Sequence, residues 1–197
     1  MKKIAINDKI SYVECSEDPL SADIGIVRDG EEIWLYDVGN DIRNLEGLSG
    51  QYNVVLSHFH QDHVGSLEKI GIKKLYVSKE TQKHVKPAGV IVEEDVFVGN
   101  LHIFPLRSSH AKGSLGLEVD ETYAFVGDAL YCKAKEGKYC YNAQLLREEI
   151  DKLKALKATY LLASHHPGLV RRKDEVIVEL EEIYKMRVPN SPEIQLK

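Results

Sequence analysis

The stretch Ser57-His58-Phe59-His60-Gln61-Asp62-His63-Val64-Gly65 places three histidines and one aspartate within six residues. The residues before it, 52–56, form a short apolar run with two adjacent valines, which predicts a buried strand. The polar cluster therefore lies where a strand ends and a loop begins. Loops at strand ends are where a rigid scaffold commonly presents reactive groups.

The donor types in this loop indicate a metal site. Imidazole nitrogens and carboxylate oxygens suit Zn²⁺ and its first-row neighbours. His58 and His60 can direct two imidazoles to one point, and Asp62 and His63 can turn toward a second point nearby. The alternative is a polar loop that happens to be rich in histidine, but four donor residues in this order favour metal binding.

Composition and charge are those of an ordinary globular protein. The chain has 197 residues, of which 43% are apolar and 29% charged, and we expect a single domain over residues 1–197 with a sizeable core. The net charge of −5 gives no basic excess to neutralise phosphates, so no nucleic-acid partner is expected. The basic run Arg171-Arg172-Lys173 is interpreted as a solvated stretch before a helix.

The chain also predicts a cytoplasmic location. Its first residues, Met-Lys-Lys-Ile-Ala-Ile-Asn-Asp, have no apolar segment of signal-peptide length, and no apolar run is long enough for a membrane. Cys15, Cys132 and Cys140 are odd in number and widely scattered, so we expect free thiols and a reducing compartment.

The first half of the chain predicts strands with short helices between them. A hairpin signal, Asp29-Gly30, separates two apolar runs, and the second run ends in Asp37-Val38-Gly39. We interpret Asp37 as a turn residue or as a buried carboxylate that holds the histidines in place. Strands are expected at 2–14, 23–27, 32–36, 52–56 and 73–77, and helices at 41–49, 64–70 and 80–85, the last capped by Ser78.

The second half repeats the pattern. Strands are expected at 90–92, 96–98, from 101–104 onward, 115–119, 123–126 and 159–163. Helices are expected at 143–157, capped by Asn142, and at 173–186. Residues 131–141 show few periodic signals, and the polar tail from Pro189 is expected to fray. This order fits an α+β or α/β sandwich, with sheets inside and helices outside.

Further donor residues follow later strands. His110 comes after the strand that begins at 101–104, Asp128 follows 123–126, and the pair His165-His166 follows 159–163. Either histidine of that pair can supply a ligand. His84 has no ligand neighbour and is interpreted as a surface residue, and His102 as a residue on a sheet face.

This order resembles the metallo-β-lactamase-fold superfamily of metal-dependent hydrolases. The resemblance covers residues 23 to about 167, and its six-residue loop is the most specific part. It implies a four-layer αββα sandwich. The matching residues are His58-x-His60-x-Asp62-His63, the lone His110, Gly127-Asp128, the terminal His165, and the upstream turn Asp37-Val38-Gly39.

The resemblance also implies the ligand sets of two divalent metal ions. His58, His60 and His110 would hold the first. Asp62, His63 and His165 would hold the second, and Asp128 would bridge both. His165 is preferred over His166 because it falls where the family places its last ligand. Zinc is the expected metal, with manganese or iron as alternatives.

The implied reaction is hydrolysis by a metal-bound hydroxide of a small ester, thioester, lactone or phosphodiester. Asp62 is the candidate catalytic residue because it can orient the hydroxide as well as bind metal. Tyr131, Tyr139 and Tyr141 are interpreted as pocket-lining or core residues, and Lys112 as an anion contact or a solvated lysine. Two alternatives are an iron-dependent oxidoreductase of the sulfur dioxygenase type and a non-catalytic metal-binding domain. The sequence predicts neither a substrate nor an oligomeric state.

Overall fold

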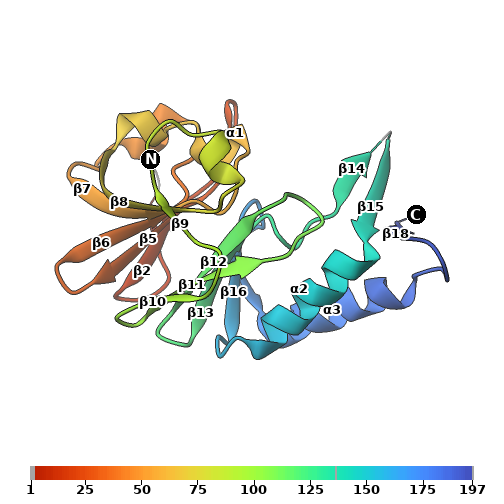
Figure 1. Cartoon of the computed structure of the whole chain (residues 1–197). Helices are drawn as coiled ribbons and strands as arrows, with labels where there is room; N and C mark the ends of the chain where they lie inside the picture. The colour runs from red at the N-terminus through yellow and green to blue at the C-terminus, as the bar shows by residue number, and fades with distance from the viewer. Residues whose placement is uncertain (1–2, 136, 197) are drawn as a thin grey trace.

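Two large mixed β-sheets form the centre of the protein (Figure 1). The computed structural model describes residues 3–135 and 137–196. Within these residues the first sheet has the strand order β1-β2-β5-β6-β7-β8-β9. The bounds of its strands are β1 (Lys3–Ala5), β2 (Ile10–Val13), β5 (Ile24–Asp29), β6 (Glu32–Tyr36), β7 (Gln51–Val55), β8 (Gly71–Val77) and β9 (Val90–Ile91).

The second sheet has the order β10-β11-β12-β13-β16-β17. Its strands are β10 (Val96–Val98), β11 (Leu101–Leu106), β12 (Ser114–Val119), β13 (Tyr123–Gly127), β16 (Tyr160–Ala163) and β17 (Val170–Arg172). Two small sheets are built from β3 (Ser16–Glu17) with β4 (Leu20–Ser21), and from β14 (Lys133–Lys135), β15 (Lys138–Asn142) and β18 (Glu193–Gln195).

Helices cover the outer faces of both sheets. In Figure 1, α2 (Ala143–Ala155) and α3 (Lys173–Lys185) lie side by side along the second sheet. The first sheet is covered by shorter pieces: α1 (Gln61–Val64) and the 3₁₀ turns η1 (Ile42–Leu45), η2 (Leu67–Lys69) and η3 (Thr81–Lys83). None of the helices in the described part of the chain is long and apolar enough to cross a bilayer.

Three buried apolar layers hold these parts together. The middle layer lies between the sheets and includes Trp34, Tyr36 and Phe125. A second layer joins the second sheet to α2 and α3, and a third joins the first sheet to Leu45, which belongs to η1, and to α1 and η2. This arrangement confirms the expected four-layer αββα sandwich. One helical layer is reduced to single turns.

Strand direction brings the ends of several strands to one edge. β6 and β7 are parallel, so both end on the same side of the first sheet. In the second sheet β11 and β13 both run antiparallel to β12, and β13 is parallel to β16, so these three also end together. The carboxyl ends of parallel strands in open sheets are where ligands commonly bind. The predicted donor residues follow these strands.

Hydrogen bonds join the two sheets at this edge. The Leu115 amide donates to the Ser57 carbonyl (2.8 Å), and the Tyr36 hydroxyl donates to the Leu115 carbonyl (2.7 Å). Gly127 has a φ of +55°, and a Cβ atom there would lie 2.7 Å from the Cβ of Ser57. Only glycine fits this position, both for its conformation and for the space available.

Several predictions differ from the structure, and the helices expected at 41–49 and 80–85 are only the 3₁₀ turns η1 and η3. Residues 2–14 form the hairpin β1–β2 where one strand was expected, because the Asn7 side chain accepts from the Lys9 and Ile10 amides and turns the chain. The helix expected at 64–70 begins earlier, at Gln61, and stops because the Ser66 amide donates to the Gly39 carbonyl.

The other two differences lie near the C-terminus. Residues 131–141 include the hairpin β14–β15, which pairs with β18 through contacts distant in sequence. The tail expected to fray is therefore ordered through Ile194, which is 1% exposed and packs into the layer under α2. Ile194 and Leu196 are the two apolar residues of a polar tail and give little sequence signal, although both pack against this layer. The three cysteines are free thiols, as expected.

Glu149 is a carboxylic acid buried inside an apolar layer. It lies on α2 between Leu146 and Leu153, is completely buried, and has no hydrogen-bond partner among the described residues. Burial disfavours the carboxylate and raises the pKa of Glu149 well above its ordinary value of 4.5. The folded protein therefore keeps this proton to a higher pH than the unfolded chain does.

We expect the free energy of unfolding to fall as pH rises above 4.5, because only the unfolded state then loses the Glu149 proton. Glu149→Leu should remove this contribution and stabilise the protein by about 1–3 kcal/mol at about pH 8. At about pH 4, where the carboxyl is protonated in both states, the difference should shrink. Urea unfolding at both pH values measures it, and a variant less stable than wild type at the higher pH would contradict this account.

Candidate metal centre

The histidine loop is held by its backbone. The one-turn helix α1 begins directly after His60 and carries Asp62 and His63. The carbonyl of Asp62 accepts from the Ala22 amide (2.9 Å), and that of His63 accepts from the Val38 amide (3.0 Å). Two neighbouring segments therefore fix the turn that carries Asp62 and His63.

The first donor group consists of three imidazoles. His58, His60 and His110 each bring a ring nitrogen within 4.8 Å of the others. The Nδ1 atom of His60 lies 2.9 Å from Nε2 of His58 and 3.0 Å from Nε2 of His110. A neutral ring nitrogen offers one proton or one lone pair, so His60 Nδ1 cannot satisfy both neighbours. A cation that accepts one lone pair from each ring satisfies all three.

Burial keeps these rings neutral. The pKa of His58 is far below its ordinary value, first because of burial and then because three other histidines lie nearby. Burial is also the main reason that the pKa values of His60 and His110 are lowered. Neutral imidazole is the form that binds metal ions, and here it persists below neutral pH.

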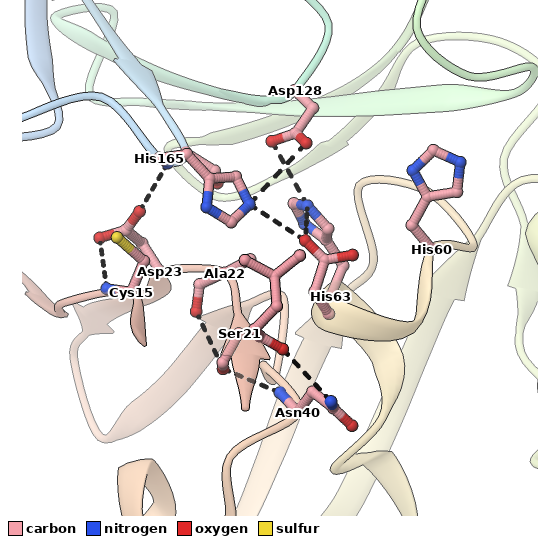
Figure 2. A network of polar contacts seen from close by, with 12 residues as sticks. Cys15, Ser21, Ala22, Asp23, Asn40, His60, His63, Asp128 and His165 are labelled. Carbon is pink, nitrogen blue, oxygen red and sulfur yellow. Dashed lines mark hydrogen bonds and ion pairs between the residues drawn. The ribbon is translucent and has the colours of Figure 1, made fainter. Parts of the chain in front are cut away.

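The second donor group is rich in carboxylates. It consists of Asp62, His63, Asp128 and His165, again with donor atoms within 4.8 Å of one another. Nε2 of His165 lies 3.0 Å from Oδ2 of Asp62, and Nε2 of His63 lies 3.3 Å from Oδ1 of Asp128. Figure 2 shows the Asp128 carboxylate above His63 and His165, with the His60 ring to one side.

The electrostatics of this group favour a positive charge. Burial lowers the pKa of His63, but the adjacent Asp37 and Asp128 outweigh burial and raise it to about 10. The hydrogen bond with Asp62 raises the pKa of His165 against the effect of burial. The carboxylates that stabilise protons on these rings would stabilise a bound cation in the same way.

Asp128 lies between the two groups. Its Oδ2 atom is 3.3 Å from Nε2 of His110 in the first group, and its Oδ1 atom is 3.3 Å from Nε2 of His63 in the second. One carboxylate therefore faces both donor sets. Two divalent cations side by side repel each other, and an anion between them offsets the repulsion.

Asp37 holds two of the rings from behind. It is completely buried, and its Oδ2 atom accepts from the Ser57 hydroxyl and from Nδ1 of His63, both at 2.7 Å. The Ser57 oxygen in turn lies 2.9 Å from Nδ1 of His58. Both Nδ1 protons are thus used in hydrogen bonds. The lone pair on Nε2 of each ring is left to bind a metal ion. The structure places Asp37 where the buried-carboxylate interpretation expected it.

Asp23 holds His165 in place in a similar way, although no sequence pattern indicated this role. Its Oδ2 atom accepts from the His165 amide (2.9 Å), and its Oδ1 atom accepts from the Cys15 amide (3.0 Å), as Figure 2 shows. His165 has a φ of +60°, a conformation costly for a side chain of this size. The bond to Asp23 holds it there. His166 lies outside both donor groups.

The residues present fit metal ions on two independent grounds. The donor set of imidazole nitrogens and carboxylate oxygens suits zinc and neighbouring divalent metals. In addition, Nε2 of His63 and Oδ1 of Asp128 are buried without a hydrogen-bond partner among the described residues. Unpaired buried polar atoms are rare and costly, and a cation between them would pair both.

Comparison with solved structures identifies the architecture. The metallo-β-lactamase DIM-1 superimposes with a TM-score of 0.70 at 14% identity, over 93% of this chain and 96% of that one. The chain has the metallo-β-lactamase fold. An archaeal metallo-β-lactamase superfamily protein from Sulfolobus tokodaii has a TM-score of 0.61 at 15% identity, over 93% of this chain and 90% of its own.

The same fold occurs in a protein of another kind. The flavodiiron protein from Giardia intestinalis has a TM-score of 0.70 at 13% identity, over 94% of this chain and 60% of its own. No protein-family model and no curated protein matches the sequence. At these identities the likeness establishes the metallo-β-lactamase fold, and the reaction must be argued from the site.

The remaining candidate residues fall into two classes. His84 is exposed and stacks on Phe59, and His102 lies on a sheet face between Asp95 and Glu118, so neither joins the donor groups. Tyr131 is half-buried beside the centre, where its hydroxyl donates to the Ser164 carbonyl (2.6 Å). Tyr141 packs into the core, and Tyr139 is 60% exposed.

Asp37→Asn should lower metal affinity by about 10–100-fold. The asparagine side chain carries no charge behind His63, and its NH2 group would face an N–H or O–H group that now donates to Asp37. The change suits the backbone, since Asp37 has a φ of +59° and asparagine tolerates that conformation. Competition with a chromophoric chelator measures the affinity. Asp41→Asn is the matched control, because Asp41 is also buried but bonds to Arg43 away from the centre. Equal losses in both variants would refute a specific role for Asp37.

Proposed function

We propose that the protein is a metal-dependent hydrolase with a dinuclear site that cleaves a small ester, thioester, lactone or phosphodiester. One observation carries this proposal: seven donors from four strand ends converge in two adjacent groups that share Asp128. In sequence order they are His58, His60, Asp62, His63, His110, Asp128 and His165.

The residues divide the work between the two positions. His58, His60 and His110 would hold one ion, Asp62, His63 and His165 the other, and Asp128 would contact both. Divalent ions, with zinc expected and manganese or iron as alternatives, lower the pKa of water and polarise the bond to be cleaved. No serine or cysteine nucleophile is then required. Cys15, whose amide donates to Asp23, lies at the surface, and partial desolvation with the nearby Asp23 and Glu14 raises its pKa to about 11, which argues against a thiolate role.

Asp62 is the proposed catalytic carboxylate. It is buried on one side by His63 and His165, and 15% of its side chain remains exposed to solvent. Burial raises the pKa of Asp62, but its contacts with His165 and His63 bring the net value below the ordinary one. It is therefore ionised at neutral pH, and it can accept a hydrogen bond from an attacking water and keep that water oriented.

An iron-dependent oxidoreductase is the second candidate. The observation that favours it is the likeness to a flavodiiron protein at the same TM-score as the metallo-β-lactamase DIM-1. Histidine and carboxylate ligands serve iron as well as zinc. Metal identity separates the two candidates.

The adjacent histidines provide a matched test of the hydrolase. His165→Ala should lower the bound metal from about two ions per chain to about one and reduce kcat/KM about 100-fold or more, because it removes a donor from the second position. His166→Ala should leave both unchanged, since His166 lies outside the donor groups. Elemental analysis gives the metal content, and a panel of carboxylic esters, thioesters, lactones and phosphodiesters gives the activity.

The outcomes separate the candidates. Zinc or manganese with hydrolysis of one substrate class supports the hydrolase. Iron with oxygen consumption supports the oxidoreductase. Full metal content without either activity indicates a metal-binding domain, and a chain that takes up no transition metal after reconstitution refutes all three.

A further inference from the structure

A cavity of about 950 Å³ is lined by His110 and by no member of the second donor group. Its lining comes from the loop at 107–114, from the segment after β8, and from β15 with the start of α2. Its volume is within the range of small-molecule pockets, about 300–1,000 Å³. Because His110 lines the cavity and also belongs to the first donor group, a molecule bound here can reach the metal centre.

The turn after His110 directs a lysine to this cavity. Gly113 has a φ of +76°, and a Cβ atom there would lie 2.6 Å from Oγ of Ser78 and 2.9 Å from Cβ of Glu80. The turn is therefore pressed against the segment after β8 and can accept only glycine. This packing fixes the backbone on both sides and sets Lys112 at the cavity wall, with 81% of its side chain exposed.

The cavity is positively charged in a negatively charged protein. The whole chain has a net charge of −5, whereas the described residues that line the cavity include five basic and three acidic side chains. The basic ones are Lys79, Lys83, Arg107, Lys112 and Lys133, and the acidic ones are Glu80, Glu93 and Glu193. An excess of basic over acidic side chains in a concave site favours the approach of anions.

The ion pairs in the wall leave Lys112 available. Glu80 contacts Lys83 at 2.7 Å and Lys112 at 3.7 Å, so one carboxylate serves two lysines and the closer pair is with Lys83. Arg107 meets Glu148 at 3.6 Å, an exposed contact of the kind that contributes little energy. A ligand anion can therefore form an ion pair with Lys112 without breaking a buried ion pair.

The core contributes almost no surface to the cavity. Val92, Leu106 and Leu115 border it, but all three side chains are at most 3% exposed. A ligand therefore meets mainly the polar and charged side chains of the walls.

We propose that this cavity binds an anionic group, a carboxylate or a phosphate, of a small-molecule substrate, with Lys112 as its main contact. This inference rests on the proposed hydrolysis in one respect, because the bound molecule is a substrate only if the protein is a hydrolase. The bond to be cleaved would lie beyond His110, at the donor groups. Lys112 is thus a specificity-determining residue, and uncharged esters should be poorer substrates.

Binding of inert probes tests the cavity without any turnover. Phenylphosphonate and phenylacetate supply the two anion types on the same apolar ring, and phenylacetamide is the uncharged analogue. Titration of the metal-loaded, ¹⁵N-labelled full chain should shift the amides of Lys112, Gly113 and Ser114 with one or both anions. Lys112→Gln should weaken that binding about tenfold, because it removes a charge-assisted hydrogen bond, and should leave the metal content unchanged.

Lys185→Gln is the matched control, because Lys185 is an exposed lysine paired with one glutamate on α3, outside the cavity. It should leave anion binding at the wild-type affinity. Equal affinity of wild type and Lys112→Gln for the anions would overturn the proposal, because the anions would then bind the metal ions alone. Equal binding of phenylacetamide and phenylacetate, or no saturable binding of either anion, would overturn it as well.

A kinetic comparison tests whether the cavity takes part in substrate binding. For two esters that differ only in a distal carboxylate or its methyl amide, Lys112→Gln should raise KM for the charged ester about tenfold and leave kcat and the uncharged ester unaffected. An equal effect on both esters would overturn the assignment. If none of the four substrate classes in the panel is hydrolysed, the proposed function fails while the probe titration still decides whether the cavity binds anions.

Discussion

The buried carboxylate of Asp37 is the interaction around which the candidate site is built. A fully buried charge is costly unless neighbouring groups donate to it. Asp37 receives the Ser57 amide and hydroxyl and Nδ1 of His63, all at 2.7 Å. These three bonds attach the end of β6 to the start of the histidine loop and orient two rings. Without the charge, the His58 and His63 donors lose their fixed direction.

The second constraint is the close approach of the two sheets. Gly127 lets β13 come against Ser57, so that Asp128, the next residue, projects between His63 from the first sheet and His110 from the second. His165 follows the strand parallel to β13 and reaches the same point, held by Asp23 from the first sheet. Each sheet therefore contributes to both donor groups, and the site depends on the packing of the whole sandwich.

The sequence revealed the parts of the site whose donors are close together in the chain. His58 to His63 stand out because four donors fall within one turn, and a resemblance in order added His110, Asp128 and His165. Asp23 gave no such signal, because its partner His165 is 142 residues away. The hairpin at β14–β15 and the terminal strand β18 were missed for the same reason, since each is stabilised by pairing between distant segments and not by a local pattern. The position of Lys112 at a cavity likewise depends on the packing of Gly113 against Ser78.

The central claim is that this fold forms two metal positions that share one carboxylate. Anomalous diffraction at the zinc edge, from crystals grown with zinc, tests it most directly. The account predicts two peaks roughly 3.5–4 Å apart, one among His58, His60 and His110 and one among Asp62, His63 and His165, with Asp128 between them. A single peak, or peaks away from these side chains, would contradict it.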